Sequence, residues 1–177
     1  MDYNVLSEEE QIKAIEENSF SIKYIKEPSE RVQLTAVRQD GCLIEYIKEP
    51  SEKVQMKAVQ QNGLSIHYIS NPSEKVQLEA VKENSYSIEH IENPSEKIQL
   101  EAIKQDGGSI DCIVNPSETV IYTVLEKDLD LIRYIVNPPE EMIKHAIRKD
   151  WKLINYIDDP SEEIKELAEI HKELQGG

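Results

Sequence analysis

The side chains that most often carry chemistry are few and widely spaced in this chain. His67 and His90 fall at neighbouring positions of successive repeats, but two histidines without a third ligand at matching spacing are a weak zinc signature. Cys42 and Cys112 match neither a metal-binding nor a redox spacing. Carboxylates are scattered rather than paired, and the chain has neither a Gly-rich phosphate loop nor a Gly-x-Ser-x-Gly motif. We therefore predict no catalytic residue, no metal site and no cofactor, and hence a protein that is not an enzyme.

The most regular chemical feature is a tyrosine column, that is, tyrosines at the same position of successive copies of a 22-residue repeat. His90 and Cys112 occupy this position in two of the copies. The tyrosines are Tyr24, Tyr46, Tyr68, Tyr134 and Tyr156. Two interpretations stay open, because stacked aromatic residues can form a stripe for a partner or the amphipathic edge of a core with hydroxyls at its rim.

Two neighbouring columns vary freely between copies. The residue before the tyrosine column is Lys23, Glu45, His67, Glu89, Asp111, Arg133 or Asn155, and the residue that opens the second element is Phe20, Cys42, Leu64, Tyr86, Gly108, Asp130 or Lys152. Constant columns build a scaffold, whereas variable exposed columns either carry specificity or are plain solvent positions. The predicted partner-binding residues are Phe20, Lys23, Tyr24, Glu45, Tyr46, Leu64, His67, Tyr68, Tyr86, Glu89, His90, Asp111, Arg133, Tyr134, Trp151, Asn155 and Tyr156.

The repeat that positions these residues is marked by proline. Pro28, Pro50, Pro72, Pro94, Pro116, Pro138 and Pro160 are spaced by 22 residues, and only Pro139 lies outside the series. An unbroken period of this length is typical of a solenoid, in which each unit packs on its neighbours. We predict a single domain over residues 1–177, with eight copies that start near residues 6, 28, 50, 72, 94, 116, 138 and 160.

Each copy predicts a helix followed by a shorter element. In the copy that starts at Pro72, Asn71 can cap a helix with proline at its first position and Glu74 at its third, and apolar spacing extends it over ten to twelve residues. In the first copy Ser7 is the expected cap, with Glu10 three residues later. Asp40-Gly41, Asn62-Gly63 and Asp106-Gly107 suit a left-handed C-terminal cap. A run such as Ser87–Ile91 can be a strand, but a short helix or 3₁₀ turn closes the repeat more easily, because Asn-Pro ends the run at once.

These patterns predict an all-α fold, a right-handed α-solenoid of eight 22-residue helix–turn–short-helix repeats whose last copy is a polar terminal cap. The motif Pro-Ser-Glu-x-Val-Gln-Leu-x-Ala-Val followed by Asn/Asp-Gly resembles the short two-helix solenoid repeats of bacterial and phage proteins of unknown function. It is also similar to variant leucine-rich repeats and HEAT-like α-solenoids, although the repeat length departs from the variant leucine-rich pattern. The resemblance implies a helical superhelix used for binding and transfers no catalytic residue.

The charge narrows the class of partner. A net charge of −15 disfavours direct binding to nucleic acid or to an anionic membrane. One glutamate column is expected to interact with helix dipoles: Glu8, Glu30, Glu52, Glu74, Glu96, Glu118, Glu140 and Glu162. The other 27 acidic and 20 basic residues leave −7, which can attract a basic partner.

The predicted function is therefore a non-catalytic protein–protein interaction module, a repeat scaffold or adaptor. The alternative is an acidic inhibitor or decoy that blocks a basic nucleic-acid-handling enzyme, for example a phage anti-defence protein. A homodimer through the solenoid ends is a further option. Cysteine usage, the absence of a signal-peptide pattern at the N-terminus and the absence of a long apolar run predict a cytoplasmic protein.

Overall fold

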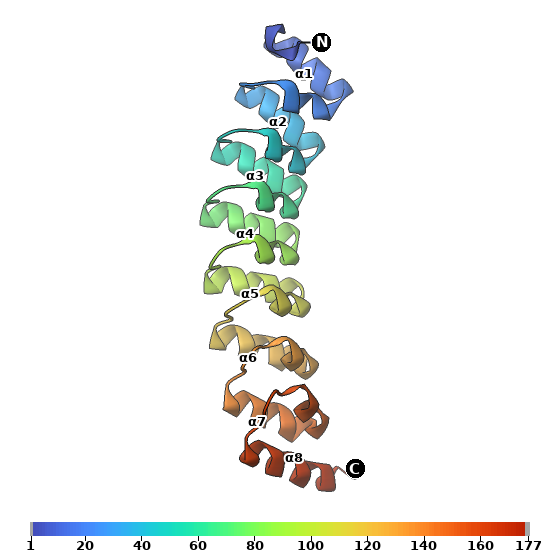
Figure 1. The fold of residues 1–177 in the computed structure, drawn as a ribbon, viewed down its shortest axis with the longest axis vertical. Coiled ribbons are helices and arrows are strands. Elements are labelled where there is room, and N and C mark those ends of the chain that lie inside the picture. The colour runs from blue at the N-terminus through green and yellow to red at the C-terminus, as the bar shows by residue number, and fades with distance from the viewer. Residues whose placement is uncertain (1, 176–177) are drawn as a thin grey trace. The chain divides into compact units, whose positions relative to one another are not determined.

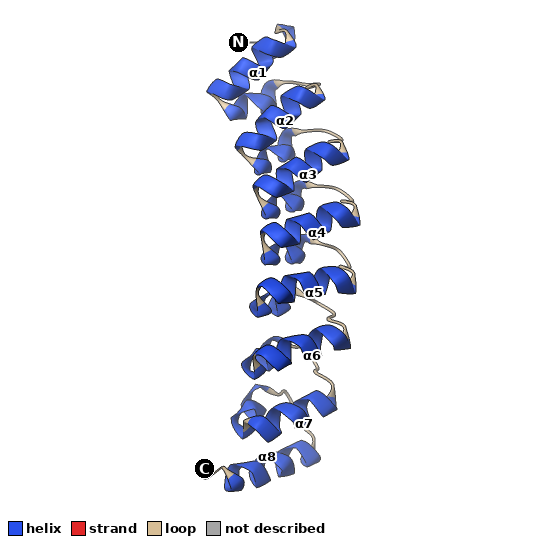
Figure 2. Ribbon diagram, turned by 180° about the vertical axis from the view of Figure 1, so that it is seen from behind, coloured by secondary structure: helices blue, strands red, loops and turns tan. Residues whose placement is uncertain are grey.

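The computed structural model describes residues 2–175 and confirms the predicted all-α repeat fold (Figure 1). Within these residues eight α-helices alternate with 3₁₀ helices, and no strand occurs (Figure 2). The α-helices are α1 (Glu8–Glu17), α2 (Glu30–Gln39), α3 (Glu52–Gln61), α4 (Glu74–Glu83), α5 (Glu96–Gln105), α6 (Glu118–Lys127), α7 (Glu140–Lys149) and α8 (Glu162–Leu174). The 3₁₀ helices are η1 (Tyr3–Val5), η2 (Ser19–Tyr24), η3 (Gly41–Tyr46), η4 (Gly63–Tyr68), η5 (Ser85–His90), η6 (Gly107–Cys112), η7 (Leu129–Tyr134) and η8 (Trp151–Tyr156).

The chain forms two compact units, residues 1–102 (unit 1) and 103–177 (unit 2). In unit 1, α1 to α4 pack each against the next, and η2 to η5 form a second row in the same order (Figure 1). The 3₁₀ helices η2, η3 and η4 also bridge two repeats, since η3, for example, packs against both α2 and α3. In unit 2, η6, η7 and η8 form a comparable row, and α7 packs against α8.

The shorter element of each repeat is a 3₁₀ helix, which agrees with the helical interpretation of that run. Its fourth residue is an isoleucine that lies in the core, as at Ile22, Ile44 and Ile66. The α-helices add a buried column of small residues, so that Ala36 and Ala58 are fully buried. Small side chains at this position allow adjacent helices to approach closely. The core is therefore a narrow layer between the α-helices and the 3₁₀ helices.

α4 begins two residues later than the sequence predicts. Asn71 is not the N-cap of α4, because the cap is Ser73, whose Oγ accepts a hydrogen bond from the Val76 N–H. Asn71 instead has a φ of 51°, and this left-handed residue turns the chain from η4 towards α4. Asparagine tolerates that conformation better than most residues. In the first repeat the prediction is confirmed, since Ser7 and Glu10 form a complete capping box.

The first-turn glutamates do more than complement helix dipoles. The Oγ of Ser51, which caps α3, donates a hydrogen bond of 2.8 Å to Glu30 of the preceding repeat. The same bond joins Ser29 to Glu8 and, at 2.9 Å, Ser73 to Glu52. A cap serine therefore accepts from its own helix while it donates to the repeat before it. This double use ties successive copies together along one edge of unit 1.

Glycine follows the α-helices for a reason other than the predicted left-handed cap. Asp40 is extended, with φ −148° and ψ 116°, and its side chain accepts a hydrogen bond from the Cys42 N–H to cap η3. Gly41 is needed because a Cβ there would lie 2.3 Å from the Ala58 carbonyl oxygen of the next repeat. The left-handed prediction is thus wrong, and close packing between repeats replaces it.

The last repeat differs from the others in the described residues. Its α-helix, α8, is 13 residues long, and no 3₁₀ helix follows it up to residue 175. None of the helices in residues 2–175 has the length and apolar character needed to cross a membrane.

Candidate functional site

The exposed surface of the 3₁₀ helices is the candidate site, and 3₁₀ geometry determines which side chains form it. With three residues per turn, side chains at i and i+3 lie on the same side of the helix. The first and fourth residues face the core: Gly41 and Ile44 are buried, and first residues such as Ser19 are half-buried. This leaves the second and fifth residues facing away from the core. The sixth residue is also exposed, as at Tyr46. We call the second, fifth and sixth residues of η2 to η8 the 3₁₀ face.

Almost all of the residues predicted to bind a partner lie on the 3₁₀ face. Those of unit 1 are exposed: Phe20, Lys23, Tyr24, Glu45, Tyr46, Leu64, His67, Tyr68, Tyr86, Glu89 and His90. Those of unit 2 that are exposed are Asp111, Arg133, Tyr134, Asn155 and Tyr156. Trp151 is different, because it is the first residue of η8 and is half-buried, with Lys172 Nζ of α8 5.5 Å from its ring centroid. Its surroundings therefore belong to the packing of α8 rather than to the 3₁₀ face.

In unit 1 the 3₁₀ face carries a chain of ring contacts. His67 and His90 lie next to each other, as the repeat spacing predicts, with their ring centroids 4.6 Å apart. His67 also meets the edge of Tyr68 at 5.0 Å. Within residues 2–175 no group of three or more His, Cys, Asp or Glu side chains is arranged to hold a metal ion. Together with Tyr68, the two histidines form a cluster of exposed rings.

Tyr3 extends this surface beyond the first repeat. Its ring stacks on Tyr24 with centroids 5.9 Å apart and an interplanar angle of 13°. Lys23 Nζ lies 5.1 Å from the centroid of the same tyrosine. Sequence reasoning missed Tyr3 because this residue precedes the first copy and has no place in the repeat.

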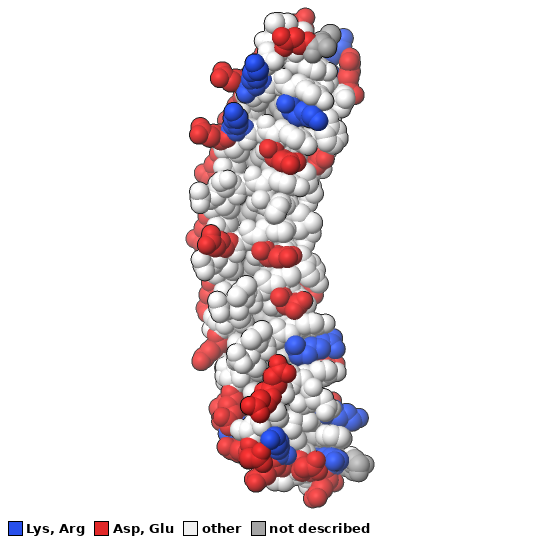
Figure 3. All heavy atoms as spheres, viewed as in Figure 1, with Lys and Arg blue, Asp and Glu red and all other residues white. Residues whose placement is uncertain are grey.

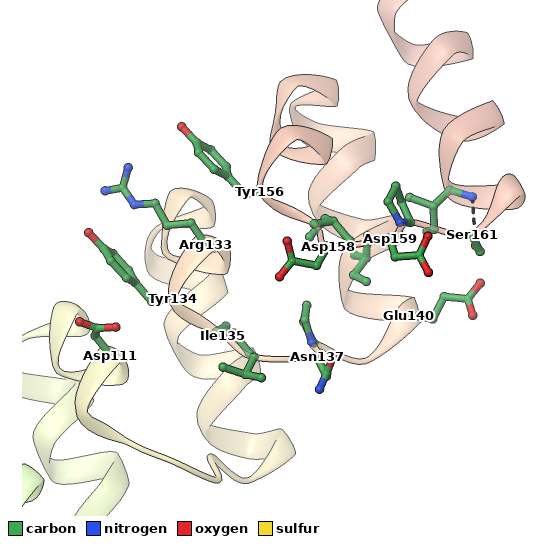
Figure 4. Close-up of a pocket in the computed structure, with 16 residues that line it drawn as sticks. Asp111, Arg133, Tyr134, Ile135, Asn137, Glu140, Tyr156, Asp158, Asp159 and Ser161 are labelled. Atoms are coloured by element: carbon green, nitrogen blue, oxygen red, sulfur yellow. Dashed lines mark hydrogen bonds between the residues drawn. The ribbon is translucent and has the colours of Figure 1, made fainter.

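In unit 2 a cation lies between two members of the tyrosine column. The Arg133 guanidinium carbon is 4.9 Å from the Tyr134 ring centroid and 5.9 Å from that of Tyr156. Figure 4 shows the arginine side chain between the two rings. The negative faces of aromatic rings attract a guanidinium group at such distances. The interaction with Tyr134 also raises the pKa of Arg133 above its ordinary value.

An open depression lies beside the 3₁₀ face in each unit. The depression of unit 2, about 450 Å³, is bordered by η7 and η8 and by the connectors that follow them (Figure 4). The depression of unit 1, about 1290 Å³, has the corresponding borders at η2, η3 and their connectors. Sequence reasoning did not name the connector residues. The sequence nevertheless shows that the connector positions vary between copies, because Lys48-Glu49 in one copy corresponds to Asp158-Asp159 in another.

Cys42 lacks the surroundings of a nucleophile. Cys42 is half-buried on the second position of η3, and its sulfur accepts a hydrogen bond of 3.3 Å from Asn62 Nδ2. Burial, and then the nearby Asp40 carboxylate, raise the pKa of the Cys42 thiol. Because the thiolate is the reactive form, this thiol reacts slowly. Cys112, at the sixth position of η6, is also half-buried.

Charge on the face shown in Figure 3 is mixed. Basic and acidic groups lie near one another towards the two ends of the view, whereas acidic groups separated by uncharged surface stand out along its middle. Some of the acidic groups are engaged within the fold, since Glu30 forms an ion pair of 2.7 Å with Lys53 of the next repeat. Comparison with protein-family models, curated proteins and solved structures finds no match to this chain. The 3₁₀ face must therefore be interpreted from its own chemistry.

Proposed function

We propose that this protein is a non-catalytic protein–protein interaction module and that its 3₁₀ face is the surface that binds the partner. The observation that carries the proposal is a contrast between adjacent residues of one element. The fourth residue of the 3₁₀ helices is a buried isoleucine from Ile22 to Ile132. The fifth residue is exposed and changes from Lys23 to Glu45 to His67. A constant buried framework that presents variable exposed side chains is the arrangement used by repeat proteins for binding.

The composition of the face supports a protein partner. Tyrosine combines a large apolar ring with a polar hydroxyl, and it is enriched in protein interfaces. Tyr24, Tyr68 and Tyr156 are each more than 40% exposed, so their rings remain available for contact. The charged fifth position supplies a pattern that can select one partner over another.

The alternative function, an acidic decoy for a nucleic-acid-handling enzyme, has less support. A decoy needs a continuous acidic surface, whereas the face in Figure 3 carries both signs of charge. First-turn glutamates such as Glu8 and Glu30 bond to serine and basic side chains of the next repeat, so their charge also serves the scaffold. A basic partner remains compatible with the net charge of −15. The wide separation of Cys42 and Cys112 in the sequence is compatible with our proposal of a reducing, cytoplasmic environment.

Site-specific photo-crosslinking in cells that produce the protein tests the proposed function. A benzophenone amino acid replaces Tyr68 on the 3₁₀ face or, as the matched control, Lys82, which is exposed on α4. We expect one protein to be cross-linked from position 68 and not from position 82, and the complex to persist at high salt. Equal products from both positions, or no product from either, would contradict the proposal.

A further inference from the structure

We propose that the depression of unit 2 binds an arginine side chain from an extended segment of the partner protein. This inference rests on the proposed function and specifies the partner's chemistry. The depression is formed by Tyr134 and Tyr156 at one end and by the connectors of η7 and η8 at the other. Three observations support the proposal: the tyrosine pair already holds a guanidinium group, the surrounding charge is negative, and the equivalent depression of unit 1 is balanced in charge.

The tyrosine pair is suited to a cation. Arg133 contacts both rings, and its guanidinium carbon is at cation–π distance from each centroid, 4.9 Å and 5.9 Å. Tyr134 is 38% exposed and Tyr156 is 46% exposed, so neither ring is enclosed by its contact with Arg133. An arginine from a partner can therefore stack on the remaining ring surface or replace Arg133.

The charge around the tyrosine pair favours a second cation. One basic residue, Arg133, lines the depression, against the four acidic residues Asp111, Glu140, Asp158 and Asp159. Glu140 is engaged with Lys144 at 3.2 Å. Asp111 and Asp158 are exposed and form no ion pair within residues 2–175. The depression therefore has an excess of negative charge that its own side chains do not neutralise, and a guanidinium group complements it.

The unit 1 depression shows that this charge is local. It is built from the same repeat positions, but three lysines and three glutamates line it. These residues are Lys23, Lys26, Lys48, Glu27, Glu45 and Glu49. If the overall acidity of the chain were the only source of attraction, both depressions would attract an arginine segment to a similar degree. The two sites thus provide a comparison within one molecule.

Binding of a defined peptide to the full chain tests the inference. The probe is a labelled peptide of alternating glycine and arginine, and its control is the citrulline counterpart, which keeps the shape and lacks the charge. We expect the arginine peptide to bind more tightly, and Asp158→Asn to weaken its binding about two- to fivefold, the range of an exposed charge pair. Glu49→Gln, which removes one acidic charge from the unit 1 depression, is the control and should change the affinity by less than about twofold.

Arg133→Gln gives the sharper result, because it distinguishes two roles of Arg133. If Arg133 only maintains the shape of the depression, its removal should weaken peptide binding. If Arg133 competes with the arginine of the peptide, its removal should strengthen binding. Removing Arg133 frees both tyrosine faces, so we expect the arginine peptide to bind about two- to fivefold more tightly. Lys48→Gln removes the same charge from the unit 1 depression and should have a smaller effect. Circular dichroism confirms that each variant is folded, which we expect because these side chains are exposed.

Three results would overturn the inference: equal affinity for the citrulline peptide, equal effects of the unit 1 and unit 2 variants, or weaker binding to Arg133→Gln. The cross-linking experiment at position 68 separates this inference from the proposed function. If a partner is cross-linked but any of these three results is obtained, the proposed interaction module stands and the arginine site is rejected. The absence of a cross-link would reject the interaction module itself.

Discussion

Replacing Gly41 with alanine should separate two adjacent repeats. A Cβ at this position would lie 2.3 Å from the Ala58 carbonyl oxygen, whereas ordinary van der Waals contact begins at 3.4 Å. The oxygen belongs to the backbone of α3 and cannot rotate away, so η3 and α3 must move apart by about 1 Å. The movement also disturbs the hydrogen bond of 2.6 Å from the Gly41 N–H to Gln61 Oε1.

The balance of effects predicts a clear destabilisation by Gly41→Ala. Overpacking of this kind costs about 1–3 kcal/mol, and a weakened hydrogen bond adds up to about 1 kcal/mol. Alanine also restricts the unfolded chain, which stabilises the protein by about 0.4–1 kcal/mol, since the φ of Gly41 is not in the left-handed region. The steric cost is larger, so we expect the free energy of unfolding to fall by about 1–2 kcal/mol.

Gly107→Ala is the matched control, because Gly107 has the same position in η6. Its Cβ would meet the side chains of Leu131 at 2.8 Å and Val124 at 3.5 Å, and no backbone atom. Leu131 Cδ1 is the far end of a flexible side chain, so a change of rotamer relieves the contact. We expect a change of less than about 0.5 kcal/mol.

Native-state hydrogen exchange is the suitable assay, because repeat proteins can unfold in parts rather than as a whole. The Asn62 N–H donates to the Ala58 carbonyl at 2.9 Å and reports on the affected contact. A loss of 1–2 kcal/mol corresponds to roughly five- to thirtyfold faster exchange of this amide. If the amide hydrogens at the substituted contact exchange equally slowly in Gly41→Ala and in Gly107→Ala, close approach of the next repeat is not the reason for glycine at position 41.

Three further predictions concern single side chains. Ser87 Oγ is buried without a hydrogen-bond partner in the described part of the chain, whereas Ser109 Oγ donates to a backbone carbonyl at 2.7 Å. Ser87→Ala should therefore raise the free energy of unfolding by about 1 kcal/mol and Ser109→Ala should lower it by about as much, and urea denaturation that gives the same sign for both would contradict this. Glu49 has a φ of 46°, so Glu49→Asn should stabilise by about 0.5–1 kcal/mol in thermal denaturation, and a lower melting temperature would refute the assignment of strain. Hydrogen bonds from a lysine and a serine of the next repeat hold the pKa of Glu30 below its ordinary 4.5. The contribution of Glu30 to folding stability is therefore present above pH 4.5 and is lost as the pH falls through the pKa of the folded state. Acid denaturation should be less steep for Glu30→Gln, and an unchanged denaturation profile would argue against this contribution.

The local elements of this fold are predictable because local patterns specify them. The period of 22 residues, the α-helix with its apolar spacing and the short second helix all follow from residues near one another in sequence. The capping box of Ser7 and Glu10 is such a case, since both partners lie within one turn. Translation along the repeat also predicts that His67 and His90 are neighbours, which the structure confirms at 4.6 Å.

Features that depend on the distance between repeats needed the tertiary structure. A glycine after a helix is compatible with a left-handed cap or with close packing, and only the position of the Ala58 carbonyl shows that packing selects Gly41. Cap assignment has the same limit, because Asn71 and Ser73 are both good capping residues and the path of the connector decides between them.

The candidate site also has features that the sequence determines and features that only the tertiary structure shows. The sequence alone determined which columns vary, and 3₁₀ periodicity then places the second and fifth residues on one exposed side. Only the tertiary structure placed Arg133 against a tyrosine of the next repeat and brought Asp158 to the same depression. The physical reason is that a periodic sequence specifies equivalent positions, whereas the contact between two of them depends on how closely the repeats pack and where each connector turns.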